Sequence, residues 1–192
     1  IAVGTQVLAK GHHFPGLTLV GIVDGDLGLG GGDLRAGERT YQLLTQAAGR
    51  AGRADAPGRA MIQTHQPEHP VMLAIAAGDR AAFIEAESAA RRATGLPPYG
   101  RLASLIVSGR DPGAAERAAR RLARIAPTFR DARVLGPAPA PLAQLRGLWR
   151  WRLLLQARRD ANVQAILAEW LADVKLTDGV KLHIDVDPYN FM

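Results

Sequence analysis

The chain has 192 residues, of which 47% are hydrophobic and 22% are charged, a composition typical of a soluble globular protein with one or two cores. No stretch approaches the roughly 20 consecutive apolar residues that a membrane-spanning helix needs, so we expect a cytoplasmic protein without a membrane partner. The absence of cysteine excludes a disulfide framework and a thiolate metal site within these residues.

The formal net charge of +6 is distributed unevenly. Residues 1–98 hold nine basic and nine acidic side chains, and residues 157–192 hold four basic and six acidic ones. Residues 99–156 hold eleven arginines against three acidic residues, so the basic surplus belongs to this segment. Such a segment attracts a phosphate backbone, but a solvated basic face has the same composition. Charge alone leaves both interpretations open.

The sequence begins at Ile1, inside an apolar segment without a polar lead-in, and we expect it to be a piece of a longer protein. Consecutive prolines at Pro97 and Pro98 divide it, because they cannot continue a helix. Before them, strand-like and helix-like runs alternate, which predicts α/β layers too short for a complete doubly wound domain. The strand-like runs are residues 19–23 and 60–64, and the helix-like runs are residues 38–50, 71–77 and 79–94.

After the prolines, we expect a strand at residues 103–108, an amphipathic helix, two strands around a proline-rich hairpin, a second helix and a final strand. The first helix has a basic polar face and an apolar stripe, formed by Ala115, Ala118, Ala119, Leu122 and Ile125. Asp160 is a suitable N-cap for the second helix. This βαββαβ order predicts a ferredoxin-like α+β sandwich.

The final strand alternates apolar and polar residues, which is typical of a sheet with one buried face. Its inward residues are Val180, Leu182, Ile184 and Val186, and its outward residues are Lys181, His183, Asp185 and Asp187. The outward carboxylates are expected to face solvent or to pair with arginine rather than to bind metal.

Two glycine-containing phrases in the first part can carry chemistry. In residues 4–15, Thr5 and Lys10 follow the end of an apolar strand, and glycines at 4 and 11 allow close approach to a phosphate. In residues 46–53, Arg50 and Arg53 emerge at the end of a helix, where two guanidinium groups suit a phosphoryl group. Alternatively, residues 4–15 form a simple surface turn. The alternative for Arg50 and Arg53 is that their charge complements the dipole at the C-terminus of the helix.

The two phrases together resemble motifs V and VI of the superfamily 2 helicases. Further phrases look like those of the PriA family of primosomal replication-restart helicases, and they lie at residues 9–15, 33–39, 64–70, 96–99, 134–139 and 184–188. The resemblance covers the whole chain. It implies an α/β protein in which part of a RecA-like helicase lobe 2 (1–66) is followed by a helical connector (67–98) and a ferredoxin-like DNA-binding domain (99–192).

The resemblance also implies roles for individual residues. Arg53 corresponds to the arginine finger, Arg50 to a second phosphate contact and Gln46 to the nucleotide-sensing position of motif VI. The nucleotide site would further include Gly49 and Gly11. Thr5, Gln6 and Lys10 would lie where ATP and single-stranded DNA meet.

The implied cofactors are ATP and Mg²⁺, acting in a helicase that restarts replication at stalled or branched forks. No phosphate-loop motif and no acidic Mg²⁺ motif occurs in these residues, so the fragment alone is expected not to hydrolyse ATP. The implied partners are single-stranded and forked DNA, single-strand-binding protein and primosome proteins.

Basic and aromatic residues alternate along residues 146–155. Trp149 and Trp151 share one face with leucines, which favours core packing over base stacking. Arg150 and Arg152 share the other face, with Arg146 on the same side, and we assign these three arginines to phosphate contacts, with solvated charge as the alternative.

Histidines do not predict a metal site here. His65 and His69 stand four residues apart, but Pro67 between them breaks the helix that such a pair would require. The family's structural zinc is bound by cysteines that the resemblance places upstream of Ile1.

Besides the helicase, two other functions fit the sequence: a DNA-structure-binding primosome adaptor that has lost ATPase activity, and a free-standing RNA-binding module.

Overall fold

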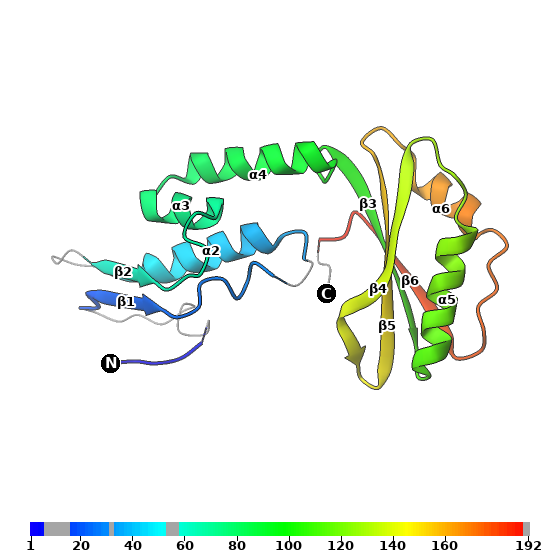
Figure 1. Ribbon diagram of the computed structural model, residues 1–192, viewed down its shortest axis with the longest axis horizontal. Helices are drawn as coiled ribbons and strands as arrows, with labels where there is room; N and C mark the ends of the chain where they lie inside the picture. Colours follow the sequence, from blue (N-terminus) through cyan, green and yellow to red (C-terminus); the bar gives the residue numbers. More distant parts are fainter. Residues whose placement is uncertain (6–15, 31–32, 53–57, 190–192) are drawn as a thin grey trace. The chain divides into compact units, whose positions relative to one another are not determined.

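The computed structural model describes residues 1–5, 16–30, 33–52 and 58–189, and it is drawn in Figure 1. The chain divides into two compact units, Ile1–Ser88 and Ala89–Met192. The boundary falls inside helix α4 (Arg80–Thr94), within the segment that the sequence assigns to a helical connector. Both units combine helices with strands, so the predicted α/β class is confirmed.

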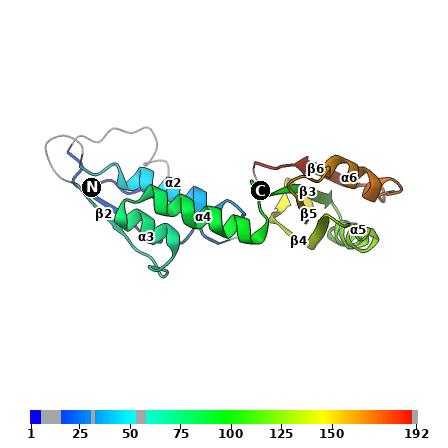
Figure 2. The same cartoon turned by 90° about the horizontal axis from the view of Figure 1, so that it is seen from above.

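The first unit contains two parallel strands and a helical layer. Strands β1 (Leu19–Ile22) and β2 (Arg59–Ile62) pair from Leu19 opposite Arg59 to Ile22 opposite Ile62. Helices α2 (Ala36–Ala48) and α3 (Pro70–Ala77) pack with the first half of α4, as Figure 2 shows. The rings of Tyr41 and Phe83 stack with centroids 4.1 Å apart, which joins α2 to α4.

Asp26 connects the loop after β1 to the loop after β2. Its carboxylate accepts hydrogen bonds from the Thr64 hydroxyl and the His65 backbone N–H, both at 2.6 Å. These hydrogen bonds, the Thr64 bond first, hold the pKa of Asp26 below its usual value of 3.8, because they stabilise the charged form. The two strand ends are therefore joined by a side chain as well as by the sheet.

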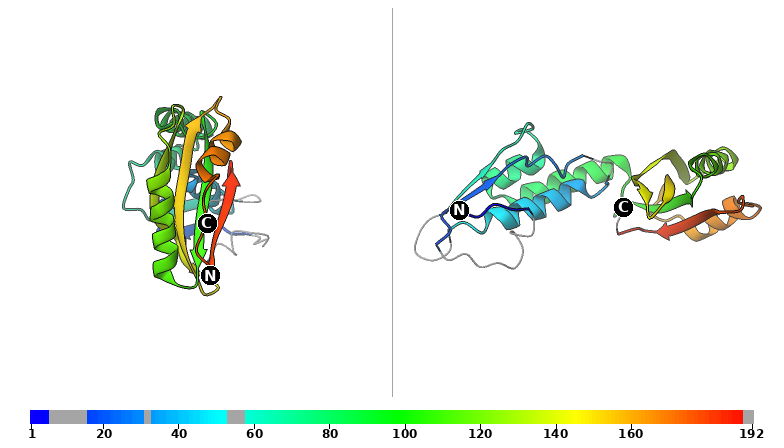
Figure 3. Two further views of the ribbon diagram at one scale, coloured as in Figure 1. Left: turned by 90° about the vertical axis from the view of Figure 1, so that its right-hand side faces the viewer. Right: turned by 90° about the horizontal axis from the view of Figure 1, so that it is seen from below.

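The second unit is a four-stranded antiparallel sheet with two helices. Its elements, in chain order, are β3 (Gly100–Gly109), α5 (Pro112–Ile125), β4 (Ala132–Leu145), β5 (Leu148–Arg158), α6 (Val163–Leu171) and β6 (Val180–Val186). The strands lie in the order β4-β5-β3-β6. The left view of Figure 3 looks onto the helices, with α5 over the β4 and β5 side and α6 over the β6 side.

Both helices pack on one face of this sheet and form the main core. The fully buried side chains include Leu105 of β3, Leu153 and Leu155 of β5, Leu122 of α5 and Val163 of α6. The apolar stripe predicted for α5 is buried at Ala115, Ala119 and Leu122, but its last member, Ile125, is 43% exposed. The alternation predicted for β6 is present, with exposed residues at every second position.

The predicted start of α6 is wrong by two residues. Asn162 is the N-cap, and its Oδ1 accepts a hydrogen bond from the Ala165 N–H at 3.0 Å. Asp160 instead lies 3.1 Å from Nη2 of Arg158, in the turn after β5. Both residue types are good N-caps, so composition alone did not separate them.

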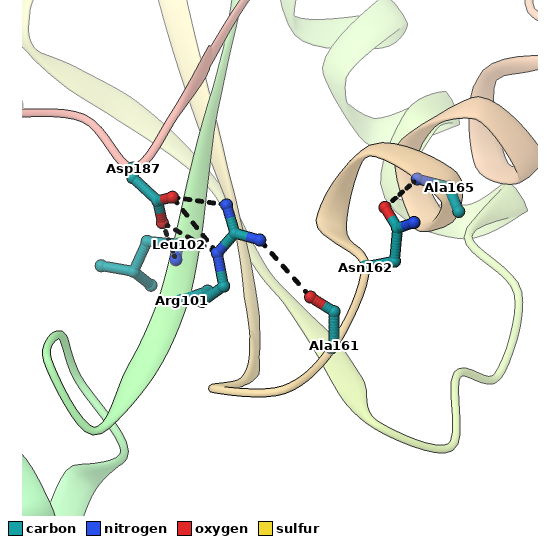
Figure 4. A network of polar contacts seen from close by, with 6 residues as sticks. All are labelled: Arg101, Leu102, Ala161, Asn162, Ala165 and Asp187. Carbon is teal, nitrogen blue, oxygen red and sulfur yellow. Dashed lines mark hydrogen bonds and ion pairs between the residues drawn. The ribbon is translucent and has the colours of Figure 1, made fainter.

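An ion pair closes one end of the sheet (Figure 4). Arg101 on β3 binds Asp187, directly after β6, with Nη2 and Oδ2 2.5 Å apart, and its Nη1 donates to the Ala161 carbonyl at 3.5 Å. The hydrogen bond to Asp187 raises the pKa of Arg101 above its ordinary value. The expectation that Asp187 pairs with arginine is confirmed.

Gln156 connects the sheet to the end of α4. It is 7% exposed, and its Nε2 donates to the carbonyls of Thr94 at 2.6 Å and Gly95 at 2.9 Å. Its Oε1 accepts from Nε of Arg133 at 2.9 Å. A buried side chain of the second unit therefore satisfies carbonyls at the C-terminal end of this helix.

We predict that Asp26→Asn loosens the ends of β1 and β2 in a pH-dependent way. A carboxylate with a lowered pKa stabilises the folded state above its unfolded pKa, and this contribution is lost as the pH falls through the folded value. Amide hydrogen exchange of residues 59–65, corrected for intrinsic rates, should be faster in the variant at pH 7, and the difference should shrink below pH about 4.

Asp24→Asn is the matched control, because it makes the same carboxylate-to-amide change in the loop after β1, at a φ of 56° that asparagine tolerates. Equal protection in Asp26→Asn and the unmodified chain at pH 7 would contradict the role of Asp26.

We predict that Gln156→Leu destabilises the second unit by about 1–3 kcal/mol, because it removes the hydrogen bonds to two partly enclosed carbonyls. All three tryptophans (Trp149, Trp151 and Trp170) lie in this unit, so urea unfolding followed by tryptophan fluorescence reports on it. Gln144→Leu, at an exposed position of β4, is the control and should leave the midpoint nearly unchanged.

Candidate nucleic-acid interface

The ATP-binding and DNA-binding residues predicted in the first unit are described only in part. Gln6, Lys10, Gly11 and Arg53 lie outside the described residues. Thr5 is described and exposed.

The end of α2 places the remaining three predicted residues together. Gln46 lies exposed in the last turn of the helix, and Gly49 is the C-cap, with its N–H donating to the Thr45 carbonyl at 2.9 Å. Arg50 follows in the turn, where its N–H donates to the Ala47 carbonyl at 3.1 Å, and its side chain is half-buried and engaged in contacts. Their predicted roles at a nucleotide stay predictions.

The same turn is fixed to the start of the first strand. Gly52, with a φ of 76°, donates its N–H to the carbonyl of Leu17 at 3.0 Å. The positive φ is the region where a residue with a Cβ would be strained. The turn that carries Arg50 is therefore held by backbone hydrogen bonds at both ends.

The sheet of the second unit brings together cations that are distant in sequence. Arg150 on β5 lies opposite Ser108 of β3, which lies opposite Lys181 of β6. In the next row, Arg152 lies opposite Ile106, which lies opposite His183. We call these positions the basic rows.

The basic rows lie on the face of the sheet opposite the helices. The neighbouring positions in each strand, such as Leu153 and Val107, point into the helical core, and successive side chains of a strand point to opposite faces. Lys181 and His183 are exposed, while Arg150 and Arg152 are half-buried. Because adjacent strands are about 4.8 Å apart, the rows extend over about 10 Å from β5 to β6, enough to reach more than one phosphate.

Acidic residues on this face lie toward its other end. Asp185 follows His183 by two residues on β6 and lies opposite Ser104 of β3, and Asp187 is bound to Arg101. Arg150 donates a hydrogen bond from Nη1 to the Leu142 carbonyl at 3.3 Å, which directs its guanidinium group toward β4. The basic rows therefore lie at one end of this face, away from Asp185.

Arg146 is placed apart from the basic rows. It lies exposed in the tight turn between β4 and β5, with a φ of 50°, followed by Gly147 with a φ of 76°. Its neighbours Leu145 and Trp149 are 43% and 37% exposed. The prediction of core packing holds for Trp151, which packs against the buried cluster, but is wrong for Trp149, because the hairpin tip reaches the end of that core.

Sequence reasoning missed Lys181 and His183 as members of this site. Their outward direction was predictable from alternation, but their alignment with Arg150 and Arg152 across β3 depends on the register of β3 with both β5 and β6. The register between distant strands is a property of the whole sheet, and no local pattern states it.

Two described histidines of the first unit take part in local hydrogen bonds. His69 is the N-cap of α3, where its Nδ1 accepts from the Val71 N–H at 3.2 Å, and the backbone N–H of His65 donates to Asp26. The part of the chain that the structure describes contains no cluster of three His, Cys, Asp or Glu side chains suited to a metal ion. Among the same residues, no helix combines the length and apolarity needed to cross a bilayer.

Comparison with known proteins identifies the family. The family model described as "Primosomal protein N C-terminal domain" matches residues 92–189, about half of the chain and nearly all of the second unit. The chain belongs to this PriA C-terminal domain family. The family predicted from the sequence is thereby confirmed.

Members of the PriA family align along the whole chain. It is 41% identical over 191 residues to the replication restart protein PriA of Rickettsia conorii, with all of this chain covered. The PriA proteins of Haemophilus influenzae and Bacillus subtilis are 41% and 36% identical, over 98% and 100% of the chain. The chain spans only 24% to 29% of the length of these three relatives.

We predict that the basic rows contribute to binding of a phosphodiester backbone. Arg150→Ala combined with Lys181→Ala should weaken binding of a single-stranded oligonucleotide and reduce the slope of log K against log salt by about 1.4, since each lost contact contributes about 0.7. Fluorescence anisotropy across a salt series measures both. Arg124→Ala combined with Lys175→Ala, in the helical layer, removes the same charge and should change the slope less; equal slopes for the two pairs would contradict this assignment.

Proposed function

We propose that the chain is the C-terminal part of an ATP-dependent 3′–5′ DNA helicase that acts in replication restart and primosome assembly at stalled or branched forks. The observation that carries this proposal is the similarity of the entire chain to proteins named replication restart protein PriA. The basic rows of the second unit support it, because they can hold the backbone of DNA.

The topology of each unit supports the finer fold assignment. In the first unit, parallel strands β1 and β2 are joined through α2, as in the βαβ units of a RecA-like lobe. In the second unit, the order β3-α5-β4-β5-α6-β6 and the strand order β4-β5-β3-β6 agree with a ferredoxin-like domain. We accordingly propose part of helicase lobe 2 followed by a ferredoxin-like DNA-binding domain.

In this proposal, ATP and Mg²⁺ bind with a phosphate loop that the first lobe of the parent protein supplies. Arg53 acts as the arginine finger, Arg50 as a second phosphate contact, and Gln46 and Gly49 line the nucleotide. An arginine at the γ-phosphate offsets the charge that develops in the transition state. The helix end that carries Gln46, Gly49 and Arg50 is braced by backbone hydrogen bonds, which suits a site that must position charge.

Thr5, Gln6 and Lys10 are proposed to contact single-stranded DNA beside this nucleotide, and Arg146 to contact DNA from the β4–β5 turn. The proposed partners are forked DNA, single-strand-binding protein and primosome proteins. The proposed zinc site of the parent protein lies on residues outside this chain.

A DNA-structure-binding adaptor without ATPase activity is the competing function. The basic rows favour it as much as the helicase, because they need no nucleotide to bind a phosphate backbone. The two functions differ in whether the arginines after α2 act on ATP.

We predict that Arg53→Ala in the full-length protein lowers DNA-stimulated ATP turnover by about 10³-fold or more and leaves affinity for forked DNA within about twofold. A coupled ATPase assay and fork binding by anisotropy measure the two quantities. Arg59→Ala, at an exposed position of β2, is the control and should keep full turnover. If the unsubstituted full-length protein showed no measurable ATP turnover, the result would instead support the adaptor without ATPase activity.

A further inference from the structure

A groove in the second unit lies between α5 and the segment that leads from α6 to β6. Residues 174–177 of that segment form one wall, and α5 forms the other, together enclosing about 200 Å³. Ala114 and Ala118 lie one turn apart on α5, and the depression forms there because their side chains are small. Leu122, 1% exposed, lies at its base.

The groove is lined by aliphatic side chains that are not fully covered. Ile125, at the end of α5, is 43% exposed, and Val174 and Leu176 are half-buried. An occupant that covered them would remove apolar surface from water, which is favourable by roughly 25 cal/mol per Å². No aromatic side chain lines the groove, so it offers no platform for stacking a base.

Three cations surround this aliphatic surface. The side chain of Arg117 is 74% exposed, and Lys175 is exposed on the opposite wall. Arg121 donates from Nη1 to the Lys175 carbonyl at 3.3 Å, which joins the two walls. Arg117 lies 3.6 Å from Asp111, which is itself 63% exposed, a separation and exposure at which an ion pair is weak. Asp173 and Asp178 flank residues 174–177 but do not line the groove.

The size of the groove limits what it can hold. At about 200 Å³ it is smaller than the 300–1,000 Å³ typical of small-molecule sites, so it suits one or two aliphatic side chains. Cations at the edges favour carboxylates next to those side chains. An apolar floor with a cationic rim is therefore complementary to a short acidic peptide that carries leucine or isoleucine.

We propose that this groove binds an acidic, leucine-containing segment of a partner protein. The site is separate from the basic rows, because the groove belongs to the helical layer and the rows lie on the opposite face of the sheet. Peptide and DNA can then be bound at the same time. The proposal does not depend on ATP hydrolysis or on the basic rows.

The test is an NMR titration of the isotopically labelled 192-residue chain with the peptide Asp-Asp-Leu-Leu-Asp-Asp. The methyl groups of Ile125, Val174 and Leu176 should shift with added peptide. Arg117→Glu should weaken the peptide about fivefold, since it replaces an attraction by a repulsion at an exposed site. Ile125→Ser should weaken it as well, because apolar contact is lost.

Arg124→Glu is the matched control, because Arg124 is an exposed residue of the same helix that does not line the groove. It makes the same change in net charge and should leave the affinity within twofold. A peptide in which serines replace both leucines should bind at least fivefold more weakly.

Three results would overturn the proposal. Equal weakening by Arg117→Glu and Arg124→Glu, or equal binding of the serine peptide, would show attraction by net charge alone. A single-stranded oligonucleotide that shifted the same methyl groups and displaced the peptide would assign the groove to nucleic acid instead.

Discussion

The register of β3 with its two neighbours is the constraint on which the second unit depends. Leu105 lies opposite Leu153 on one side and Ile184 on the other, and this row faces the helices. The next residue, Ile106, faces away, between Arg152 and His183. A slip of one residue in a strand would move its apolar side chains to solvent and its polar ones into the core. The burial of the leucines therefore fixes the positions of the cations.

Two sets of polar contacts, one on β5 and one between β3 and the end of β6, stabilise the same end of this sheet. Gln156 donates hydrogen bonds to the carbonyls at the end of α4. Leu102 lies opposite Gln156 on one side, and on its other side lies Asp187, which pairs with Arg101. Leu102 is 1% exposed although it faces away from the helices. The opposite end of the face, at Ser108, has no such cover from the described residues, and the basic rows lie there. In our proposal, structural and binding roles are thus separated along one face.

Local patterns predicted most elements, because alternation in β6 and the apolar stripe of α5 report directly on burial. They failed where two residues compete for one role, as with Asp160 and Asn162 at the start of α6. They failed again where a property depends on the end of an element: Trp149 follows the buried pattern of its strand but lies beyond the core. Long-range placement, such as Lys181 in the same row as Arg150, needs the register of the whole sheet. The family itself was predictable from short sequence motifs, because a motif is recognised by the identity of its residues and not by how those residues pack.

The basic segment of residues 99–156 looks like one surface in the sequence, but the fold divides it. Arg150 and Arg152 lie on the open face of the sheet, whereas Arg117 and Arg121 belong to a helix on the other face. Two positive regions on opposite sides each raise the local concentration of anions. In our proposals, the uncharged residues beside each region decide which anionic ligand it selects. Ser108 and Ile106 accompany the first region, and small and aliphatic side chains accompany the second. One run of arginines can therefore serve two ligands, because the surface next to each charge differs.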